Sequence, residues 1–434
     1  MARRRKLPPL EVRMNGEPVG RLERQSGGAL VFTYAPSWRE QAGAVPLSVR
    51  FPVAQAPYSG DELETWFANL LPDRRESRQR LARATGAASA GTYDLLSAAG
   101  RDCIGALQLL ESGTDGEVRR IEGTPLNEAE LAAHLRSVRT LPPGVQAPGT
   151  EFRISLAGAQ DKTALLLHGG QWQIPRGATP STHLLKLPIG RLPNEFDLSE
   201  SVANEWLCLR IAGELGLRIP EARMARFEDQ EALIVQRFDR RMSPDGRWIV
   251  RWHQEDLCQA HGVGAIHKYE SDGGPGMLAC LELLSRSREP ERDRQDFLRA
   301  QILFHWLAAT DGHGKNFSIH LHPGGSFEST PLYDILSLWP LLARRQVHRN
   351  HVKLAMAWHG TTRHYRWAKI DRSHYIKTAH AAGIPAAMVD DLLASMREAV
   401  PPAIDRVRNG LPEGFPEPIA EAVLKGLRTT AQRL

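Results

Sequence analysis

The sequence predicts an α+β fold in which a mixed region of strands and helices comes first and a mainly helical lobe follows. Two observations support this prediction. Up to about residue 250, short alternating or continuous apolar stretches typical of strands are interspersed with a few helical stretches. Beyond that point, apolar residues recur mostly at helical spacing. The length of 434 residues is enough for about two to three domains.

The first 110 residues predict a compact α+β unit. Leu10–Met14 alternates between apolar and polar residues, and Asn15-Gly16 is a typical hairpin turn before the next apolar stretch. Helical spacing or composition then predicts helices over 62–71, 74–85 and 93–100, and a strand returns at 103–110.

A helix is expected over 127–140, and the Pro/Gly-rich segment 141–149 is the best candidate for a linker. Beyond it, strands are expected over 152–156, 162–167, 182–187 and 233–235, with a helix over 199–215 between them. Later helices are expected over 276–287, 291–309, 387–399 and 417–431. The predicted segments are therefore 1–110, 111–150, 151–250 and 251–434.

The composition argues against several classes of protein. Lys and Arg number 55 and Asp and Glu 50, and a net charge of +5 over this length does not predict a coat of basic residues for nucleic acid. The cysteines at 103, 208, 258 and 280 are too widely spaced for a zinc or redox motif. The basic N-terminus precedes no apolar segment, and no apolar run reaches about 18 residues. We therefore expect a soluble cytoplasmic protein without a membrane segment.

The segment from Trp306 to Phe317 concentrates polar groups where an apolar helix ends. Asp311 and Asn316 lie five residues apart in a glycine-rich stretch, and a hairpin over 317–330 could bring Asp334 back beside Asn316. A carboxylate that orients an acceptor hydroxyl and oxygen ligands for a metal are what phosphoryl transfer needs. The alternative is that Asp311 caps a turn and Asn316 makes only a local hydrogen bond.

Three further features precede this segment. The turn 155–163 is rich in small residues, which let backbone N–H groups approach phosphate oxygens, although many such turns are plain hairpins. Lys186 interrupts an apolar strand and must reach solvent or an anion. Glu205 lies on the apolar stripe of the following helix, either as a candidate ion-pair partner of Lys186 or as a surface glutamate.

The apolar strand 232–235 runs into the polar segment Gln236–Phe238, which is typical of a hinge between two lobes. Phosphate loop, lysine strand, glutamate helix, hinge, Asp-Asn loop and metal aspartate then follow one another in the chain. This is the linear order of a two-lobed protein-kinase-like fold, with a mixed α/β N-terminal part and a mainly helical C-terminal lobe.

At these residues the chain resembles the HipA family, the bacterial serine/threonine kinases that are the toxins of type II toxin–antitoxin modules. The stretches that carry the resemblance are ISLAGAQDKTALL (154–166), STHLLKLPIG (181–190), SVANEWLCLRIAGELGL (201–217), QRFDRR (236–241), HQEDLCQAHG (253–262), KYESDGGPG (268–276), ATDGHGKNFSIH (309–320) and TPLYDILS (330–337). The first segment is similar to the family's leading domain, for example in NLLPD (69–73) and GALQLL (105–110).

The resemblance implies a kinase that uses ATP and Mg²⁺. It implies Asp311 as the catalytic aspartate, Asn316 and Asp334 as magnesium ligands, and Lys186 as the lysine on the nucleotide phosphates. Ser155 matches the serine whose autophosphorylation inactivates the kinase. The remaining nucleotide contacts that it implies are Ala157, Gly158, Ala159, Gln160, Asp161, Lys162, Thr163, Gln236, Arg237, Phe238, His313 and Lys315.

The resemblance also implies partners. The first is a small helix-turn-helix antitoxin similar to HipB, so operator DNA is expected mainly through that partner. The second is a protein substrate, possibly an aminoacyl-tRNA synthetase, whose phosphorylation would halt translation. Two alternatives stay open: a kinase of a small molecule such as an antibiotic or metabolite, and a largely structural co-repressor subunit.

The chain departs from better-known kinases in several places. It contains no H-R-D and no D-F-G motif, so the activation-loop logic of eukaryotic kinases does not transfer. Gln236 stands where an acidic residue is expected in the hinge, which matters little if backbone groups contact the adenine. The arginines at 237, 240, 241, 247 and 251 are expected to lie mostly in solvent.

Overall fold

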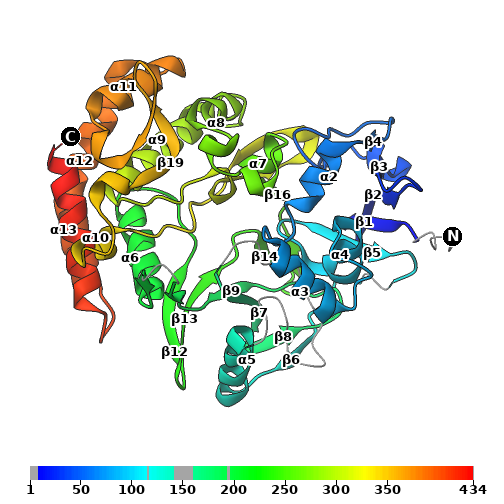
Figure 1. Cartoon of the computed structure of the whole chain (residues 1–434). Coiled ribbons are helices and arrows are strands. Elements are labelled where there is room, and N and C mark those ends of the chain that lie inside the picture. The colour runs from blue at the N-terminus through cyan, green and yellow to red at the C-terminus, as the bar shows by residue number, and fades with distance from the viewer. Residues whose placement is uncertain (1–7, 115–116, 141–159, 193–195, 434) are drawn as a thin grey trace. The chain divides into compact units, whose positions relative to one another are not determined.

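The computed structural model describes residues 8–114, 117–140, 160–192 and 196–433. These residues form two compact units. The first unit combines the chain up to Leu187 with the segments Arg226–Ile266 and Ile319–Phe327. The second unit combines Pro188–Ala225, His267–Ser318 and Glu328–Leu434. Figure 1 labels many elements of both units.

The first unit begins with a five-stranded sheet in the order β4-β3-β2-β1-β5. Asn15 and Gly16 both have positive φ, at 51° and 83°, which is the backbone of the predicted two-residue hairpin turn. The strands are β1 (Leu10–Met14), β2 (Glu17–Arg24), β3 (Leu30–Tyr34), β4 (Tyr58–Ser59) and β5 (Leu107–Glu111). The helices around them are α1 (Pro36–Arg39), α2 (Asp61–Ala68), α3 (Arg75–Thr85) and α4 (Thr92–Ala99).

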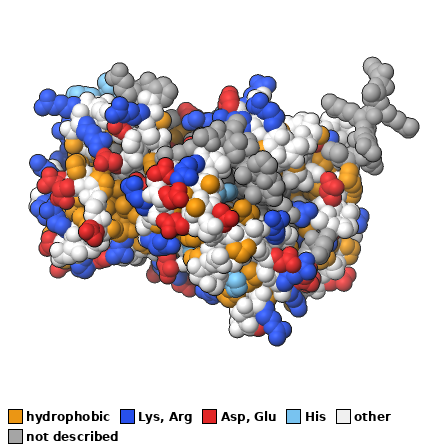
Figure 2. Space-filling view, turned by 90° about the horizontal axis from the view of Figure 1, so that it is seen from below, with side chains coloured by type: hydrophobic (Ala, Val, Ile, Leu, Met, Phe, Trp, Pro, Cys, Tyr) orange, Lys and Arg blue, Asp and Glu red, His pale blue; other side chains and the backbone are white. Residues whose placement is uncertain are grey.

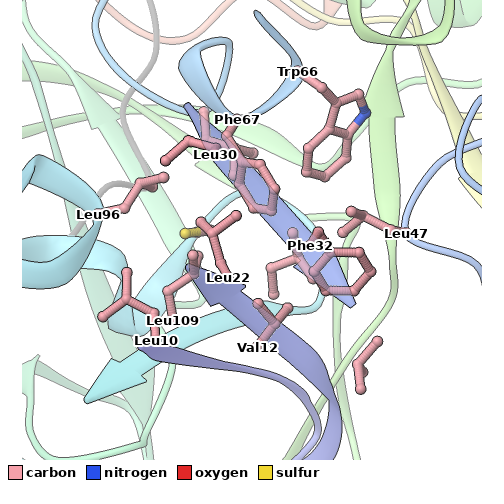
Figure 3. Packing of buried hydrophobic residues seen from close by; sticks show 14 of the residues in the cluster. Leu10, Val12, Leu22, Leu30, Phe32, Leu47, Trp66, Phe67, Leu96 and Leu109 are labelled. Atoms are coloured by element: carbon pink, nitrogen blue, oxygen red, sulfur yellow. The ribbon is translucent and has the colours of Figure 1, made fainter. Parts of the chain in front are cut away.

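One face of this sheet carries the core of the leading part. Leu10, Val12 and Leu22 are fully buried, and Figure 3 shows them converging with Phe32 and with the aromatic side chains of α2. Burial alternates along β1, because successive strand residues point to opposite faces. The alternation read from the sequence therefore specifies which face packs inward.

A six-stranded sheet in the order β12-β13-β9-β7-β8-β6 follows. Helix α5 (Glu128–Thr140) packs against β7 and β13. The strands are β6 (Gly123–Pro125), β7 (Lys162–His168), β8 (Gln171–Pro175), β9 (His183–Lys186), β12 (Ala222–Phe227) and β13 (Gln230–Gln236). Shorter elements complete this part, namely β14 (Arg240–Met242), β15 (Ile249–Arg251), β16 (Gln254–Asp256), α7 (Leu257–Ala260), β17 (Ser318–Leu321) and β18 (Phe327–Ser329).

The second unit is mainly helical. Helix α6 packs against α12 and α13, and α12 and α13 pack against each other (Figure 1). Its helices are α6 (Ser201–Glu214), α8 (Met277–Leu284), α9 (Pro290–Trp306), α10 (Trp339–Ala343), α11 (Arg372–Ala381), α12 (Ala386–Asn409) and α13 (Glu417–Arg433). Its short strands are β10 (Gly190–Arg191), β11 (Asp197–Leu198), β19 (Lys353–His359) and β20 (Arg363–Arg366).

The α+β prediction is confirmed, but two details of the second unit differ from it. The hairpin of β19 and β20 was not predicted in the part expected to be mainly helical. Leu, Ala and Met in β19 favour helix, but the strand packs against α8 and α11, and this tertiary contact outweighs propensity. Helix α12 continues past Pro401 and Pro402, which are exposed, because Val400, Ala403 and Ile404 are buried on its inner face.

The surface agrees with a weak net charge. Figure 2 shows basic and acidic side chains interspersed over the face in view, without a continuous field of either sign. In the part of the chain that the structure describes, no helix is both long and apolar enough to span a bilayer. The four cysteines are buried free thiols.

Candidate active site

Asp311 lies in the loop that follows α9, with its carboxylate about half exposed at 54%. The hydroxyl of Tyr269 donates a hydrogen bond of 2.5 Å to Asp311 Oδ1. The side-chain amide of Asn316 donates a hydrogen bond of 2.6 Å to the backbone carbonyl of Asp311. The carboxylate is therefore oriented by a neighbour and still accessible to solvent, which suits a group that receives an acceptor hydroxyl.

Local geometry fixes this loop. The N–H of His313 donates to the carbonyl of Asp311 at 2.8 Å, and the N–H of Asn316 donates to the carbonyl of His313 at 2.9 Å. A Cβ at Gly312 would come within 3.1 Å of the Phe304 ring, a close contact that glycine avoids where the loop lies against α9. The glycine-rich composition thus serves a tight turn against the helix.

His313 is buried behind Asp311. Its ring packs edge-on against Tyr269 with centroids 5.1 Å apart, and its Nε2 lies 3.7 Å from Asp311 Oδ1. Burial lowers the pKa of His313 and outweighs the opposite effect of the Asp311 charge. A neutral ring at neutral pH therefore supports the loop.

The predicted hairpin returns the chain to this loop. Tyr333 donates a hydrogen bond to the carbonyl of Lys315 at 3.0 Å, and its hydroxyl lies 2.6 Å from Ser318 Oγ. Asp334 follows at once and has a φ of 61°, a left-handed conformation that aspartate tolerates better than most residues. Backbone strain of this kind is concentrated at functional sites.

The residues present fit a magnesium ion. Because the Asn316 amide nitrogen donates to the Asp311 carbonyl, its Oδ1 is the atom left for a ligand. The Asp334 carboxylate, whose charge acts on His313, supplies a second hard oxygen donor. The described residues contain no cluster of three or more His, Cys, Asp or Glu side chains arranged for a metal. Mg²⁺ is commonly bound through one or two carboxylates together with substrate phosphates and water, so a small set of hard oxygen donors is compatible with this ion.

Two lysines share one face of the six-stranded sheet in the first unit. Lys186 ends β9, is 5% exposed and lies directly opposite Lys162 of β7 in the antiparallel register. Directly opposed residues point to the same face, and like charges there are unfavourable. An arrangement of this kind suits a polyanion such as a triphosphate. The Gln160 side chain donates to the Leu187 carbonyl at 2.7 Å, which holds the end of the preceding turn against β9.

Thr163 points to the other face. Its hydroxyl lies 2.9 Å from Nε2 of His134 on α5, and burial lowers the pKa of that histidine to about 4. Thr163 thus helps to attach α5 and does not share the face of Lys186. Asp161 precedes β7, and its carbonyl accepts a hydrogen bond from the N–H of Leu187. Ser155, Ala157, Gly158 and Ala159 lie outside the described residues.

The hinge segment follows β13. Gln236 is exposed, and the ring of Phe238 packs edge-on against His320 with centroids 5.7 Å apart. The N–H of Arg237 donates to the Thr182 carbonyl at 2.9 Å, and its guanidinium forms a 2.8 Å ion pair with Asp239. The Arg237 side chain and its N–H are therefore both engaged within the first unit.

The expectation for the arginines is wrong in three of five cases. Arg237, Arg240 and Arg251 are buried, at 6%, 6% and 2% exposure. Asp102 and Asp239 pair with them, and a buried charge requires such partners. The exposed pair, Arg241 and Arg247, behaves as expected.

Glu205 lies on α6 and is 3% exposed. It belongs to the second unit and Lys186 to the first, so their ion pair stays a prediction. The neighbouring Asn204 exchanges two hydrogen bonds with the backbone of Ser337, at 2.8 and 3.0 Å. Ser337 is three residues beyond Asp334. These hydrogen bonds therefore attach α6 to the segment that carries Asp334, the candidate magnesium ligand.

Sequence reasoning missed Tyr269 and Tyr333. Tyr269 lies in the stretch KYESDGGPG, which carries the family resemblance without an assigned role. Tyr333 directly precedes Asp334. Lys315 was expected to contact the nucleotide. In the structure it is buried, and its backbone carbonyl accepts the hydrogen bond from Tyr333.

Comparison with known proteins now adds to this geometry. Residues 154–404 match the family model of the HipA-like C-terminal domain, and residues 10–110 match that of the HipA N-terminal domain. The chain is 33% identical over 407 residues to a Sinorhizobium fredii protein named "Putative kinase Y4mE", covering 92% of this chain and 91% of that one. It is 27% identical over 316 residues to the serine/threonine-protein kinase toxin HipA of Shewanella oneidensis, covering 70% of this chain and 69% of the toxin.

A solved structure shows the same fold. It is the Shewanella oneidensis HipA in complex with HipB and operator DNA, which matches with a TM-score of 0.82 and 24% identity over 98% of this chain and 97% of that one. The described residues thus have the two-lobed protein-kinase-like fold of HipA. The two family models and the extent of these matches show that the chain belongs to the HipA family of toxin kinases.

Proposed function

We propose that the chain is an ATP-dependent serine/threonine protein kinase and the toxin of a HipBA-like toxin–antitoxin module. The observation that carries the proposal is the Asp311 loop, where an exposed carboxylate is oriented by the Tyr269 hydroxyl and flanked by Asn316. Membership of the HipA family supports the same chemistry. The paired lysines of β7 and β9 add a site suited to phosphates.

In this proposal each group has a separate role. Lys186 and Lys162 hold the phosphates, and Asp311 aligns the acceptor hydroxyl and receives its proton. Asn316 and Asp334 would hold Mg²⁺, whose charge offsets the negative charge that develops on the transferring phosphoryl group. Catalysis of this kind depends on positioning and electrostatics and needs little covalent chemistry from the protein.

The biological setting belongs to the proposal as well. A HipB-like antitoxin would neutralise the kinase and provide most of the contact with operator DNA. The proposed substrate is a protein, an aminoacyl-tRNA synthetase in particular, so that phosphorylation halts translation. Ser155 is the proposed site of autophosphorylation and self-inactivation.

The test is transfer of ³²P from labelled ATP to protein. Asp311→Asn keeps the shape of the side chain and should lower the transfer rate by about 10³-fold, while nucleotide affinity stays close to wild type. Asp405→Asn, at an exposed position of α12, is the matched control and should transfer normally. Normal labelling by Asp311→Asn would refute the assignment of the base.

A second readout identifies the target. Phosphoproteomics after expression of wild type and of Asp311→Asn should find phosphoserine or phosphothreonine on a cellular protein only with the wild type. If the wild type phosphorylates an added metabolite or antibiotic and no protein, the toxin-kinase proposal fails.

A further inference from the structure

A short segment of the leading domain, residues 102–105, forms hydrogen bonds and an ion pair with Arg240 of β14, the strand that follows the hinge. Asp102 ends the 3₁₀ turn Gly100–Asp102 and is fully buried. Its carboxylate accepts hydrogen bonds from the N–H and the hydroxyl of Ser181, at 3.0 and 2.8 Å. It also forms a 3.0 Å ion pair with Arg240. All of these residues belong to the first unit.

The next residues extend the same contact. The N–H of Gly105 donates to the Asp239 carboxylate at 2.8 Å, and the Gly105 carbonyl accepts from Arg240 at 2.8 Å. The Cys103 carbonyl accepts from Arg240 at 2.9 Å and from Arg237 at 3.2 Å. A Cβ at Gly105 would come within 2.8 Å of the backbone nitrogen of Gln254, so a side chain at this position would clash with the backbone.

The charges in this cluster depend on one another. Arg237, Arg240 and Arg251 face Asp102 and Asp239, and every member is at most 6% exposed. Burial opposes ionisation of Asp239, but Arg237 and Arg240 outweigh it and lower its pKa to about 2. Because water cannot replace a missing partner in the interior, loss of either carboxylate must shift the guanidiniums that it binds.

This cluster is directly connected to the hinge. The Ser181 hydroxyl donates to Asp102 and accepts from Arg237 at 2.9 Å. Arg237 is the middle residue of the Gln236–Phe238 segment, and its N–H bonds the Thr182 carbonyl. The leading domain thus fixes both the side chain and the strand environment of the central hinge residue.

We propose that Asp102 is a positioning residue for the nucleotide base, so that the leading domain helps to set the affinity of the kinase for ATP. The inference rests on the proposed function and on the expectation, from the family resemblance, that Gln236–Phe238 contacts the adenine. Asp102 acts through Ser181 and Arg237 and touches no substrate itself.

The test compares two probes, ATP and inorganic tripolyphosphate, which has the phosphates without the base. Binding to the full chain is measured by calorimetry in the presence of Mg²⁺. Asp102→Asn keeps the shape of the side chain and should weaken ATP binding by about tenfold, the equivalent of one or two neutral hydrogen bonds. Tripolyphosphate binding should not change, because Lys162 and Lys186 remain in place.

Two further variants make the result interpretable. Ser181→Ala removes only the hydroxyl between Asp102 and Arg237. It should weaken ATP binding by less than Asp102→Asn does and leave tripolyphosphate binding unchanged. This variant provides the test if Asp102→Asn does not fold. Asp94→Asn is the matched control: Asp94 is also a buried aspartate of the leading domain, paired with Arg24 at 2.9 Å, but it lies outside the cluster. It should bind both probes like the wild type.

The outcomes separate the inference from the function on which it rests. Equal changes in the affinities for ATP and tripolyphosphate, or no change in either, would overturn the positioning role and leave the kinase proposal intact. A wild-type chain that does not bind ATP would instead overturn the proposed function.

Discussion

The buried carboxylate of Glu255 should make the stability of the first unit depend on pH in an unusual direction. Glu255 lies in β16 and is fully buried. It accepts hydrogen bonds from Ser48 Oγ at 2.6 Å, from the N–H of Val49 at 2.9 Å and from Trp66 Nε1 at 2.7 Å. Burial nevertheless prevails over these three donors and raises its pKa from 4.5 to about 7.

The sign follows from proton binding. The folded state keeps the proton on Glu255 up to about pH 7, whereas the unfolded chain releases it near its ordinary pKa of 4.5. Between these values the folded state binds more protons, so the free energy of unfolding falls as the pH rises. Integrated from about pH 5 to about pH 8, these two pKa values give a loss of about 2.5 kcal/mol.

Urea unfolding of the wild type and of Glu255→Gln at several pH values measures this contribution. Over that range the wild type should lose about 2.5 kcal/mol more stability than the variant, which cannot titrate at this position. Glu40→Gln, at an exposed position of the leading domain, should keep the wild-type slope. Equal slopes for the wild type and Glu255→Gln would show that the three donors keep Glu255 ionised, which would refute the reasoning.

Three other substitutions test separate parts of the structure. Tyr269→Phe removes the hydrogen bond to the Asp311 carboxylate, the proposed base, and should lower kcat by about tenfold with little change in the KM for ATP. An unchanged kcat would show that this hydrogen bond does not contribute to catalysis. Asp239→Asn should destabilise the fold by about 3 kcal/mol at neutral pH, because it leaves buried arginines underpaired. The pKa of Asp239 is lowered to about 2, so the difference in unfolding free energy between the wild type and Asp239→Asn should shrink as the pH falls from about 4 towards 2. A difference that does not depend on pH would contradict this prediction. Gly426→Ala places a Cβ within 2.2 Å of the Trp339 ring and should lower Tm by several degrees, about 1–3 kcal/mol of overpacking; an unchanged Tm would show that the ring can move.

The elements that position the candidate site were largely predictable, because their signals are local. The Asp311–Asn316 loop follows a long apolar helix, and Lys186 interrupts an apolar strand, so both stand out in the sequence. The hairpin that returns Tyr333 to Lys315 could be expected from two short strands and a Pro-Gly-Gly turn. Each of these inferences needs only a few neighbouring residues.

The side chains that pair with the buried arginines and with Asp311 were not predictable, because they come from distant parts of the chain. Nothing near Arg240 in the sequence indicates that Asp102, more than a hundred residues earlier, will be its counter-ion. Tyr269 meets Asp311 across 42 positions in the same way. Arginines are normally exposed, so sequence reasoning places them in solvent unless a long-range carboxylate is known.

The two hydrogen bonds between Asn204 and Ser337 have a consequence for regulation. In kinases controlled through the helix that carries the ion-pair glutamate, that helix moves while the catalytic residues stay in place. Here a third hydrogen bond, from Ser337 Oγ to the Leu307 carbonyl, joins the same serine to the end of α9. Swinging α6 alone would break the two bonds of Asn204 and leave backbone groups of a fully buried serine without these partners. An on–off switch based on movement of this helix alone would therefore be costly.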